Sequence, residues 1–245
     1  MNFEILLIWM IKNKENNMHI KILVLSLLLS GSIAHAVDEQ SVEQIRFEKD
    51  KVKYKSYIPK KYDLFEVITG DLNKDKIQDI VLIVKATDPN AWVDHEYRGK
   101  LDRNRRGIVV LFGEKETYKK VMQNLSVFSS ENEEGGVYFQ PELWIEIKNN
   151  LLNIHYAHGR YGYWNYIFRY ETHDFRLIGY DSSEHHGPRV ESDTSINLMT
   201  GKKRYRNNLN QDEEQDSKFK ETWTKVNYTP IYLSQIKDMD ELYFD

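Results

Sequence analysis

The most specific chemical pattern in this chain is a run of oxygen-bearing side chains at alternate positions. Residues 71–79 read DLNKDKIQD. Counting from Asp71, positions 1, 3 and 5 carry carboxylate or amide oxygens and position 9 carries a further carboxylate. Such side chains converge inside a tight loop, where the backbone carbonyl at position 7 can join them, and Ca²⁺ prefers a shell of this kind. The spacing therefore predicts a calcium site whose ligands are Asp71, Asn73, Asp75, Ile77 and Asp79.

The flanking sequence excludes one calcium-binding motif and leaves a simpler alternative open. An EF-hand needs Glu at position 12 and a helix on either side of the loop. Position 12 is Leu82 here, and the segments on both sides have strand-like composition. The alternative without metal is an Asx-rich turn that holds itself by hydrogen bonds from side chains to the backbone.

The segment 70–80, GDLNKDKIQDI, resembles the calcium loop of FG-GAP and VCBS repeats, which are integrin-type propeller blades. The matching residues are Gly70, Asp71, Asn73, Asp75, Asp79 and Ile80. In that family the loop joins two strands, so the resemblance implies a single such repeat with a calcium-stabilised hairpin. Lys76 departs from the pattern, because the family usually has a left-handed glycine there. A lysine brings a positive charge close to the ion, and we expect weaker calcium binding.

Four longer stretches resemble a group of uncharacterised exported bacterial proteins that carry one such loop. These stretches are residues 129–133, 135–139, 155–164 and 179–184. This second resemblance implies no activity.

The densest aromatic stretch, residues 160–170, offers a candidate ligand surface. If a strand begins at Tyr163, then Trp164 and the alternate aromatic residues after it share one face and form sheet core. Arg160, Tyr161 and Tyr163 precede that strand or begin it. Their rings and guanidinium group are suited to binding a sugar or a peptide.

Two other groups of residues invite a catalytic or metal interpretation. His155 and His158 face opposite ways if one strand holds both, so a zinc site needs the strand to end between them. Acidic side chains could supply the carboxylate pair of a glycoside hydrolase. The candidates are Glu131, Glu133, Glu134, Glu142, Asp181 and Glu184. Their spacing does not determine which two would pair, and solvated surface carboxylates are the alternative. The chain contains no Gly-x-Ser-x-Gly elbow, phosphate loop or dinucleotide fingerprint.

These residues must be positioned by short strands and tight turns. Residues 79–85, DIVLIVK, form a β-branched run typical of a strand buried on both faces. Residues 142–180 alternate apolar with polar around turns such as Asn149-Asn150. We therefore predict an all-β fold of antiparallel four-stranded meanders, propeller-blade-like, with a few short helices, one of them at 233–242 capped by Ser234. A mixed sheet packed with helices is the alternative.

The N-terminal region predicts export. Residues 18–36 combine a short basic start, an apolar run and Ala34-His35-Ala36, the small-x-small pattern at which signal peptides are cleaved. Residues 1–17 do not fit a signal peptide, and we interpret them as a mis-annotated extension. The mature chain, 37–245, is then expected to be a single β-rich domain that is periplasmic or secreted. It lacks cysteine, so no disulfide supports it.

Composition limits the function classes. Acidic residues number 38 and basic residues 34, which gives a net charge of −4 and no broad attraction to nucleic acid. The apolar run near the N-terminus is shorter than the roughly 20 residues that span a bilayer, so no membrane span is expected. We therefore expect an exported soluble binding or structural module whose ligand is a protein or a carbohydrate. A periplasmic or secreted hydrolase that uses carboxylate and histidine chemistry is the alternative.

Overall fold

The computed structural model describes residues 40–135, 138–210, 216–242 and 244. The chain divides into two compact units, Met1–Tyr54 and Lys55–Asp245. The described part of the first unit is a helix over 40–54. The expected extension (1–17) and signal peptide (18–36) lie outside the described residues. A single domain over 37–245 stays a prediction.

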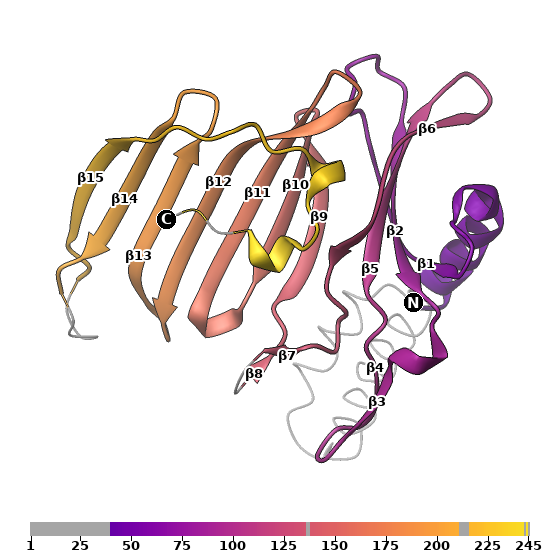
Figure 1. The fold of residues 1–245 in the computed structure, drawn as a ribbon, viewed down its shortest axis with the longest axis horizontal. Helices are drawn as coiled ribbons and strands as arrows, with labels where there is room; N and C mark the ends of the chain where they lie inside the picture. The colour runs from indigo at the N-terminus through magenta and orange to yellow at the C-terminus, as the bar shows by residue number, and fades with distance from the viewer. Residues whose placement is uncertain (1–39, 136–137, 211–215, 243, 245) are drawn as a thin grey trace, which may run out of the picture. The chain divides into compact units, whose positions relative to one another are not determined.

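The second unit is built almost entirely from antiparallel strands (Figure 1). The strands are β1 (Tyr62–Gly70), β2 (Asp79–Ala86), β3 (Trp92–His95), β4 (Gly99–Asp102), β5 (Arg106–Gly113), β6 (Tyr118–Phe128), β7 (Glu134–Gly135), β8 (Tyr138–Phe139), β9 (Glu142–Lys148), β10 (Leu151–Ala157), β11 (Gly162–Glu171), β12 (Asp174–His186), β13 (Arg189–Asn197), β14 (Lys202–Asn208) and β15 (Phe219–Lys225). Short 3₁₀ turns are η1 (Lys55–Tyr57), η2 (Pro89–Ala91), η3 (Gly159–Tyr161), η4 (Leu233–Gln235) and η5 (Met239–Glu241). The predicted all-β antiparallel fold with short helices is confirmed.

A four-stranded sheet has the order β1-β2-β5-β6. Its two central strands are buried on both faces, as the apolar run of residues 79–85 predicts. The calcium-loop candidate joins β1 to β2, and Gly70 pairs with Asp79 where the two strands meet it. The hairpin therefore places the loop at one end of this sheet.

A seven-stranded meander has the order β15-β14-β13-β12-β11-β10-β9. The predicted meander at 142–180 accounts for β9 to β12, and the three strands that follow extend the same sheet. Asn149 and Asn150 turn between β9 and β10 with φ of 54° and 60°. Positive φ at both central residues is the type I′ geometry that tight hairpins favour. Burial alternates along β10, so one face of this sheet is core and the other faces solvent.

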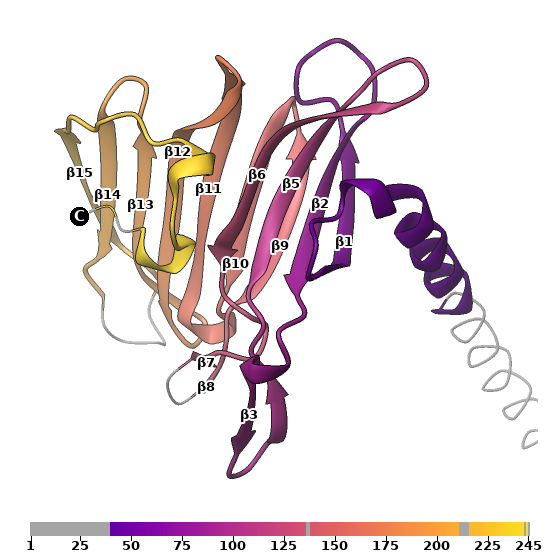
Figure 2. The same cartoon turned by 45° about the vertical axis from the view of Figure 1, so that its right-hand side comes forward.

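Residues from both sheets and from the C-terminal segment form one hydrophobic core. Figure 2 shows that segment, in yellow, lying along the seven-stranded sheet close to β6. Its Leu233 and Met239 are fully buried. The expected helix at 233–242 is wrong in form, because the segment makes two separate 3₁₀ turns capped at Tyr232 and Asp238 instead of at Ser234. An extended stretch between the turns lets buried side chains reach the core.

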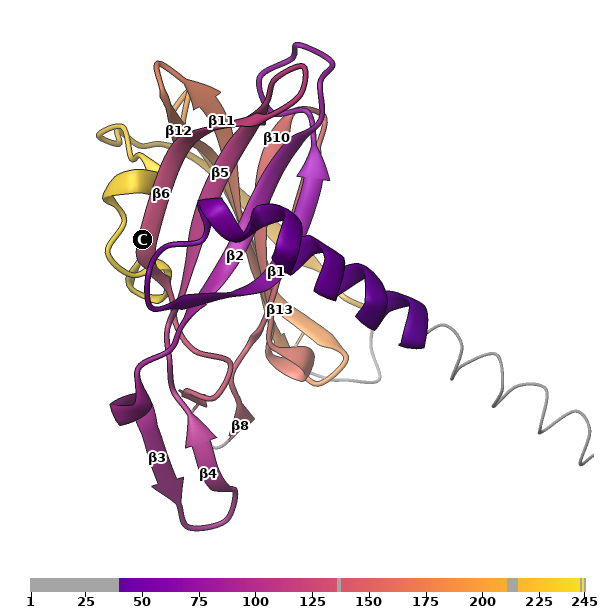
Figure 3. The ribbon, with the colours of Figure 1, turned by 90° about the vertical axis from the view of Figure 1, so that its right-hand side faces the viewer.

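Two small hairpins complete the unit. The β3–β4 hairpin projects beyond the end of the four-stranded sheet (Figure 3), and β7 pairs with β8. Within the described part of the chain, none of the helices combines the length and the apolar character that a bilayer crossing requires.

Candidate functional site

A groove of about 720 Å³ lies on the solvent-facing side of the seven-stranded sheet. Its lining begins at Trp144 on β9 and ends at Phe219 on β15, so it crosses every strand of the sheet. The side chains come from the positions that alternate with the core residues of the same strands. The groove is therefore a direct product of strand alternation along a long meander.

Strand register places one row of side chains directly across the sheet. Each member is paired with the next on the neighbouring strand, and paired residues project from the same face. From β9 to β15 the row is Trp144, His155, Asn165, Asp181, Ser195, Arg204 and Trp223. Tryptophans thus stand at both ends of a mainly polar row.

Aromatic rings gather over β9 to β12. The His155 ring stacks on Tyr163 with centroids 5.3 Å apart, and Trp144 packs edge-to-face against it with centroids 6.5 Å apart. Burial lowers the pKa of His155, although Glu146 opposes that shift. The imidazole is therefore largely neutral at pH 7, and this part of the groove presents ring faces instead of a positive charge.

Arginine side chains dominate the other end of the groove. Asp193 accepts hydrogen bonds from Nε of Arg206 at 2.9 Å (Oδ1) and 2.8 Å (Oδ2), and these bonds raise the pKa of that arginine. Arg204 reaches Asp193 only through Nη2, at 3.4 Å. Arg206 is therefore held by its hydrogen bonds to Asp193. Most N–H donors of Arg204, in contrast, have no hydrogen-bond partner among the described residues.

Polar side chains in the middle of the groove also lack hydrogen-bond partners among the described residues. Within the described ranges, the side chains of Asn165 and Asp181 make no hydrogen bond to protein. Both are only partly buried, so they are solvated. A ligand in the groove therefore meets an amide and a carboxylate that no described protein group binds.

The structure separates the three residues that the aromatic stretch singled out. Tyr163 lies in β11 and lines the groove. Arg160 and Tyr161 lie in η3, outside that lining, with the guanidinium carbon 6.0 Å from the tyrosine ring. His158 follows the end of β10 and contacts Tyr161, so β10 does end between the two histidines, and only His155 faces the groove.

The candidate calcium loop is held by its own hydrogen bonds. Asp71 accepts from the backbone N–H groups of Lys74 and Lys76, at 2.7 and 3.1 Å. Asp75 accepts from the N–H of Ile77 at 2.7 Å, and Asn73 accepts from the N–H of Asp75 at 3.0 Å. These are the Asx-turn contacts of the alternative without metal. They also leave further lone pairs on each oxygen, so the calcium site stays a prediction.

Lys76 adopts φ of 68°, which is the left-handed conformation expected at the position where FG-GAP repeats have glycine. Lys74 has φ of 69° as well. Each such residue costs about 1 kcal/mol relative to a right-handed one.

Across the described residues, no three His, Asp or Glu side chains are grouped closely enough to form a metal centre.

Asp79 lies deeper than the other predicted ligands. It is fully buried and accepts from the N–H of Leu72 at 2.7 Å and from that of Gly113 at 2.9 Å. Burial raises its pKa, and the backbone hydrogen bonds oppose that effect. A Cβ at Gly113 would lie 2.4 Å from the carbonyl oxygen of Gln78, so only glycine lets β5 approach the loop this closely.

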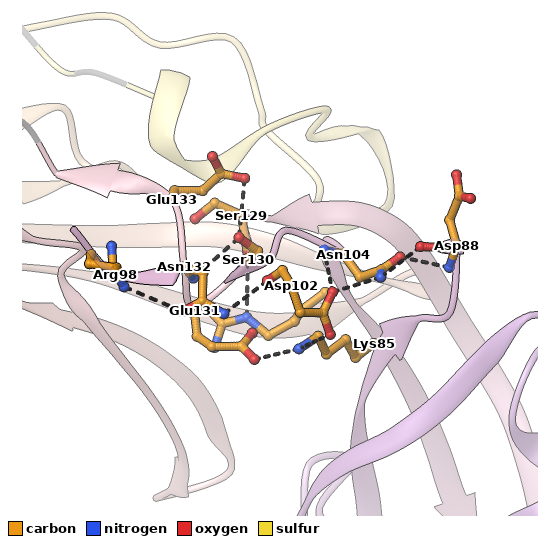
Figure 4. A network of polar contacts seen from close by, with 11 residues as sticks. Lys85, Asp88, Arg98, Asp102, Asn104, Ser129, Ser130, Glu131, Asn132 and Glu133 are labelled. Carbon is orange, nitrogen blue, oxygen red and sulfur yellow. Dashed lines mark hydrogen bonds and ion pairs between the residues drawn. The ribbon is translucent and has the colours of Figure 1, made fainter. Parts of the chain in front are cut away.

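A second polar network joins the β3–β4 hairpin to the loop that follows β6 (Figure 4). Lys85 forms ion pairs with Asp102, at 2.7 Å, and with Glu131. Asn132 donates to the carbonyl of Asp102 at 2.9 Å. Burial lowers the pKa of Lys85, but its two carboxylate partners outweigh that effect and raise it. Every charge in this cluster has a partner, which is typical of a structural clamp.

The acidic residues considered for a hydrolase do not gather at one place in the structure. Glu131 belongs to the clamp just described, Glu133 lies near Arg103, and Glu184 accepts a hydrogen bond from Ser192. The side chain of Glu134 lies outside the described residues. Glu142 is exposed at the start of β9. Only Asp181 lines the groove.

Several groove residues were missed by sequence reasoning. Trp144, Asp193, Arg204 and Arg206 lie in different strands and form no local motif. Alternation in β14, where Arg204 and Arg206 share one face, was the available signal, but it does not identify the strands beside it.

No protein-family model, no curated protein and no solved structure matches this chain.

Proposed function

We propose that this protein is a saccharide-binding module whose ligand lies in the groove of the seven-stranded sheet. The observation that carries the proposal is that the stacked rings of His155 and Tyr163 lie in the same groove as polar side chains without hydrogen-bond partners among the described residues. Apolar C–H faces of a sugar ring pack on aromatic faces, while its hydroxyl groups need hydrogen-bond partners.

The charges of the groove favour a neutral ligand. Asp193 and Arg206 neutralise each other, which leaves carboxylates at Glu146 and Asp181 and the guanidinium group of Arg204. A ligand with a single charge sign would satisfy one kind of group and leave the other unpaired, which is costly. A hydroxyl group both donates and accepts, so a sugar satisfies both kinds.

We place the protein in the periplasm or outside the cell, with the loop at 71–79 as a calcium-stabilised hairpin. The signal-peptide pattern at 18–36 supports export, and the oxygen spacing of the loop supports a hard cation. The resemblance to a single FG-GAP or VCBS repeat rests on the same loop. Calcium there would stabilise the hairpin by binding the folded state.

Binding to a glycan array of plant, fungal and bacterial oligosaccharides tests the proposal, followed by calorimetry with the strongest ligand. Tyr163→Ala should weaken that affinity at least tenfold, about 1.4 kcal/mol, because it removes a ring from the groove. Tyr161→Ala is the matched control, since Tyr161 lies outside the lining, and it should change affinity less than twofold. No glycan bound, or equal losses in both variants, would contradict the proposal.

A further inference from the structure

We infer that the saccharide is an extended, unbranched chain that lies across the strands, with several of its units in contact at once. This inference rests on the proposed function and specifies the ligand class. A mono- or disaccharide would fill only part of the groove.

The length of the groove is the first argument. Its lining includes residues from all seven strands, from Trp144 on β9 to Phe219 on β15. Adjacent strands are about 4.8 Å apart, so six steps span about 29 Å. A pyranose unit in an extended chain advances by a similar distance to one strand spacing. An extended chain can therefore place about one unit over each strand.

The ends of the row are the second argument. Trp144 and Trp223 are 63% and 59% exposed, which is unusual for side chains of this size. They lie on β9 and β15, the two edge strands of the sheet. An aromatic platform at each edge, with polar groups between, suits a chain that enters over one edge strand and leaves over the other.

The direction of the groove argues against a peptide. An extended peptide adds to a sheet parallel to its strands, because it pairs with the free backbone groups of an edge. Here the row runs across strands whose backbone groups are already paired with their neighbours. Only side chains are offered to the ligand, and a saccharide needs no backbone pairing.

Calorimetry with linear oligosaccharides of increasing length tests the inference. The probes are cello-, malto-, xylo- and chito-oligosaccharides of two to eight units. In a series that binds, affinity should rise with each added unit and level off near seven, with the seven-unit chain bound at least tenfold more tightly than the two-unit chain. A plateau at two or three units would overturn the inference and leave saccharide binding intact. Failure of all four series to bind would overturn both.

Substitutions at the two ends sharpen the test. Trp144→Ala and Trp223→Ala should each weaken binding of the longest chains at least tenfold, and should weaken binding of a three-unit chain less. Trp92→Ala is the matched control, because Trp92 is 45% exposed on β3, a strand that is not part of the seven-stranded sheet. Equal losses for short and long chains in the end variants would contradict an extended binding mode.

Discussion

At the residue scale, the loop between β1 and β2 divides its acidic side chains between two roles. Asp71 and Asp75 are in the exposed part of the loop and accept hydrogen bonds from local N–H groups. Asp79 is fully buried and joins the loop to β5 through Gly113. Asp79 therefore anchors the hairpin to the sheet, while Asp71 and Asp75 order the turn itself.

Lys76 is the residue that tunes calcium binding in this proposal. Glycine adopts the left-handed conformation of this position without a steric cost, and it removes an ammonium group from beside anionic ligands. Lys76→Gly should therefore tighten calcium binding about tenfold, or about 1.4 kcal/mol, as titration calorimetry can measure. The metal-free variant should be no more stable than the parent, because glycine adds freedom to the unfolded chain.

Lys74→Gly is the control, since it relieves a similar φ away from the position that FG-GAP repeats reserve for glycine. Equal or weaker calcium affinity in the Lys76 variant would contradict this role for Lys76, and no calcium binding by either protein would show that the loop holds itself without an ion.

At the element scale, the β3–β4 hairpin depends on a charged clamp. Lys85 on β2 bridges Asp102 on β4 and Glu131 in the loop after β6. Burial opposes ionisation of Asp102, but the Lys85 hydrogen bond lowers its pKa overall. The stabilising contribution of Asp102 is therefore present above its unfolded pKa of 3.8 and is lost as the pH falls through its folded pKa.

Lys85→Ala should lower the free energy of unfolding by about 2 kcal/mol at pH 7, because it leaves two carboxylates without their cation. The difference from the parent protein should shrink as the pH falls below 4, where the carboxylates become protonated. Urea denaturation across pH 3 to 8 measures both effects. Lys100→Ala, on the exposed part of β4, serves as the control and should change stability by less than 0.5 kcal/mol. A pH-independent loss in the Lys85 variant would indicate packing instead of charge.

At the scale of the β-rich unit, the C-terminal segment connects the two sheets. Asn124 on β6 donates to the carbonyls of Leu233 and Ile236, at 2.8 and 2.7 Å. Tyr166 on β11 donates to the carbonyl of Leu242 at 2.9 Å. The segment thus contacts a strand of each sheet and contributes buried side chains to their shared core.

Leu233→Ala should lower the free energy of unfolding by about 3 kcal/mol, because it leaves a cavity where both sheets meet. Unfolding should remain a single transition by fluorescence and circular dichroism, since the sheets share one core. Gln235→Ala, exposed on the same turn, is the control. Two resolved transitions in the parent protein would show that the sheets are stable independently.

Local patterns were enough to predict the strands at 79–85 and 142–180 and the loop between β1 and β2. The strand at 79–85 and the turn at 149–150 were predicted from neighbouring residues, and the resemblance to FG-GAP repeats implied the left-handed position at Lys76. The physical reason is that side-chain alternation, turn conformations and Asx hydrogen bonds depend on residues a few positions apart. The form of the C-terminal segment was not predictable in this way, because its turns follow from burial of Leu233 and Met239 in a distant core.

The sequence by itself determined an antiparallel β fold, a loop with calcium-like oxygen spacing and a strand that begins close to Tyr163. Only the tertiary structure decided that Tyr163 shares a groove with Trp144 and Arg204, while Arg160 and Tyr161 lie outside it. Alternation assigns a side chain to one of two faces but does not say which strands lie beside it. That depends on register across seven paired strands and on which face the common core covers.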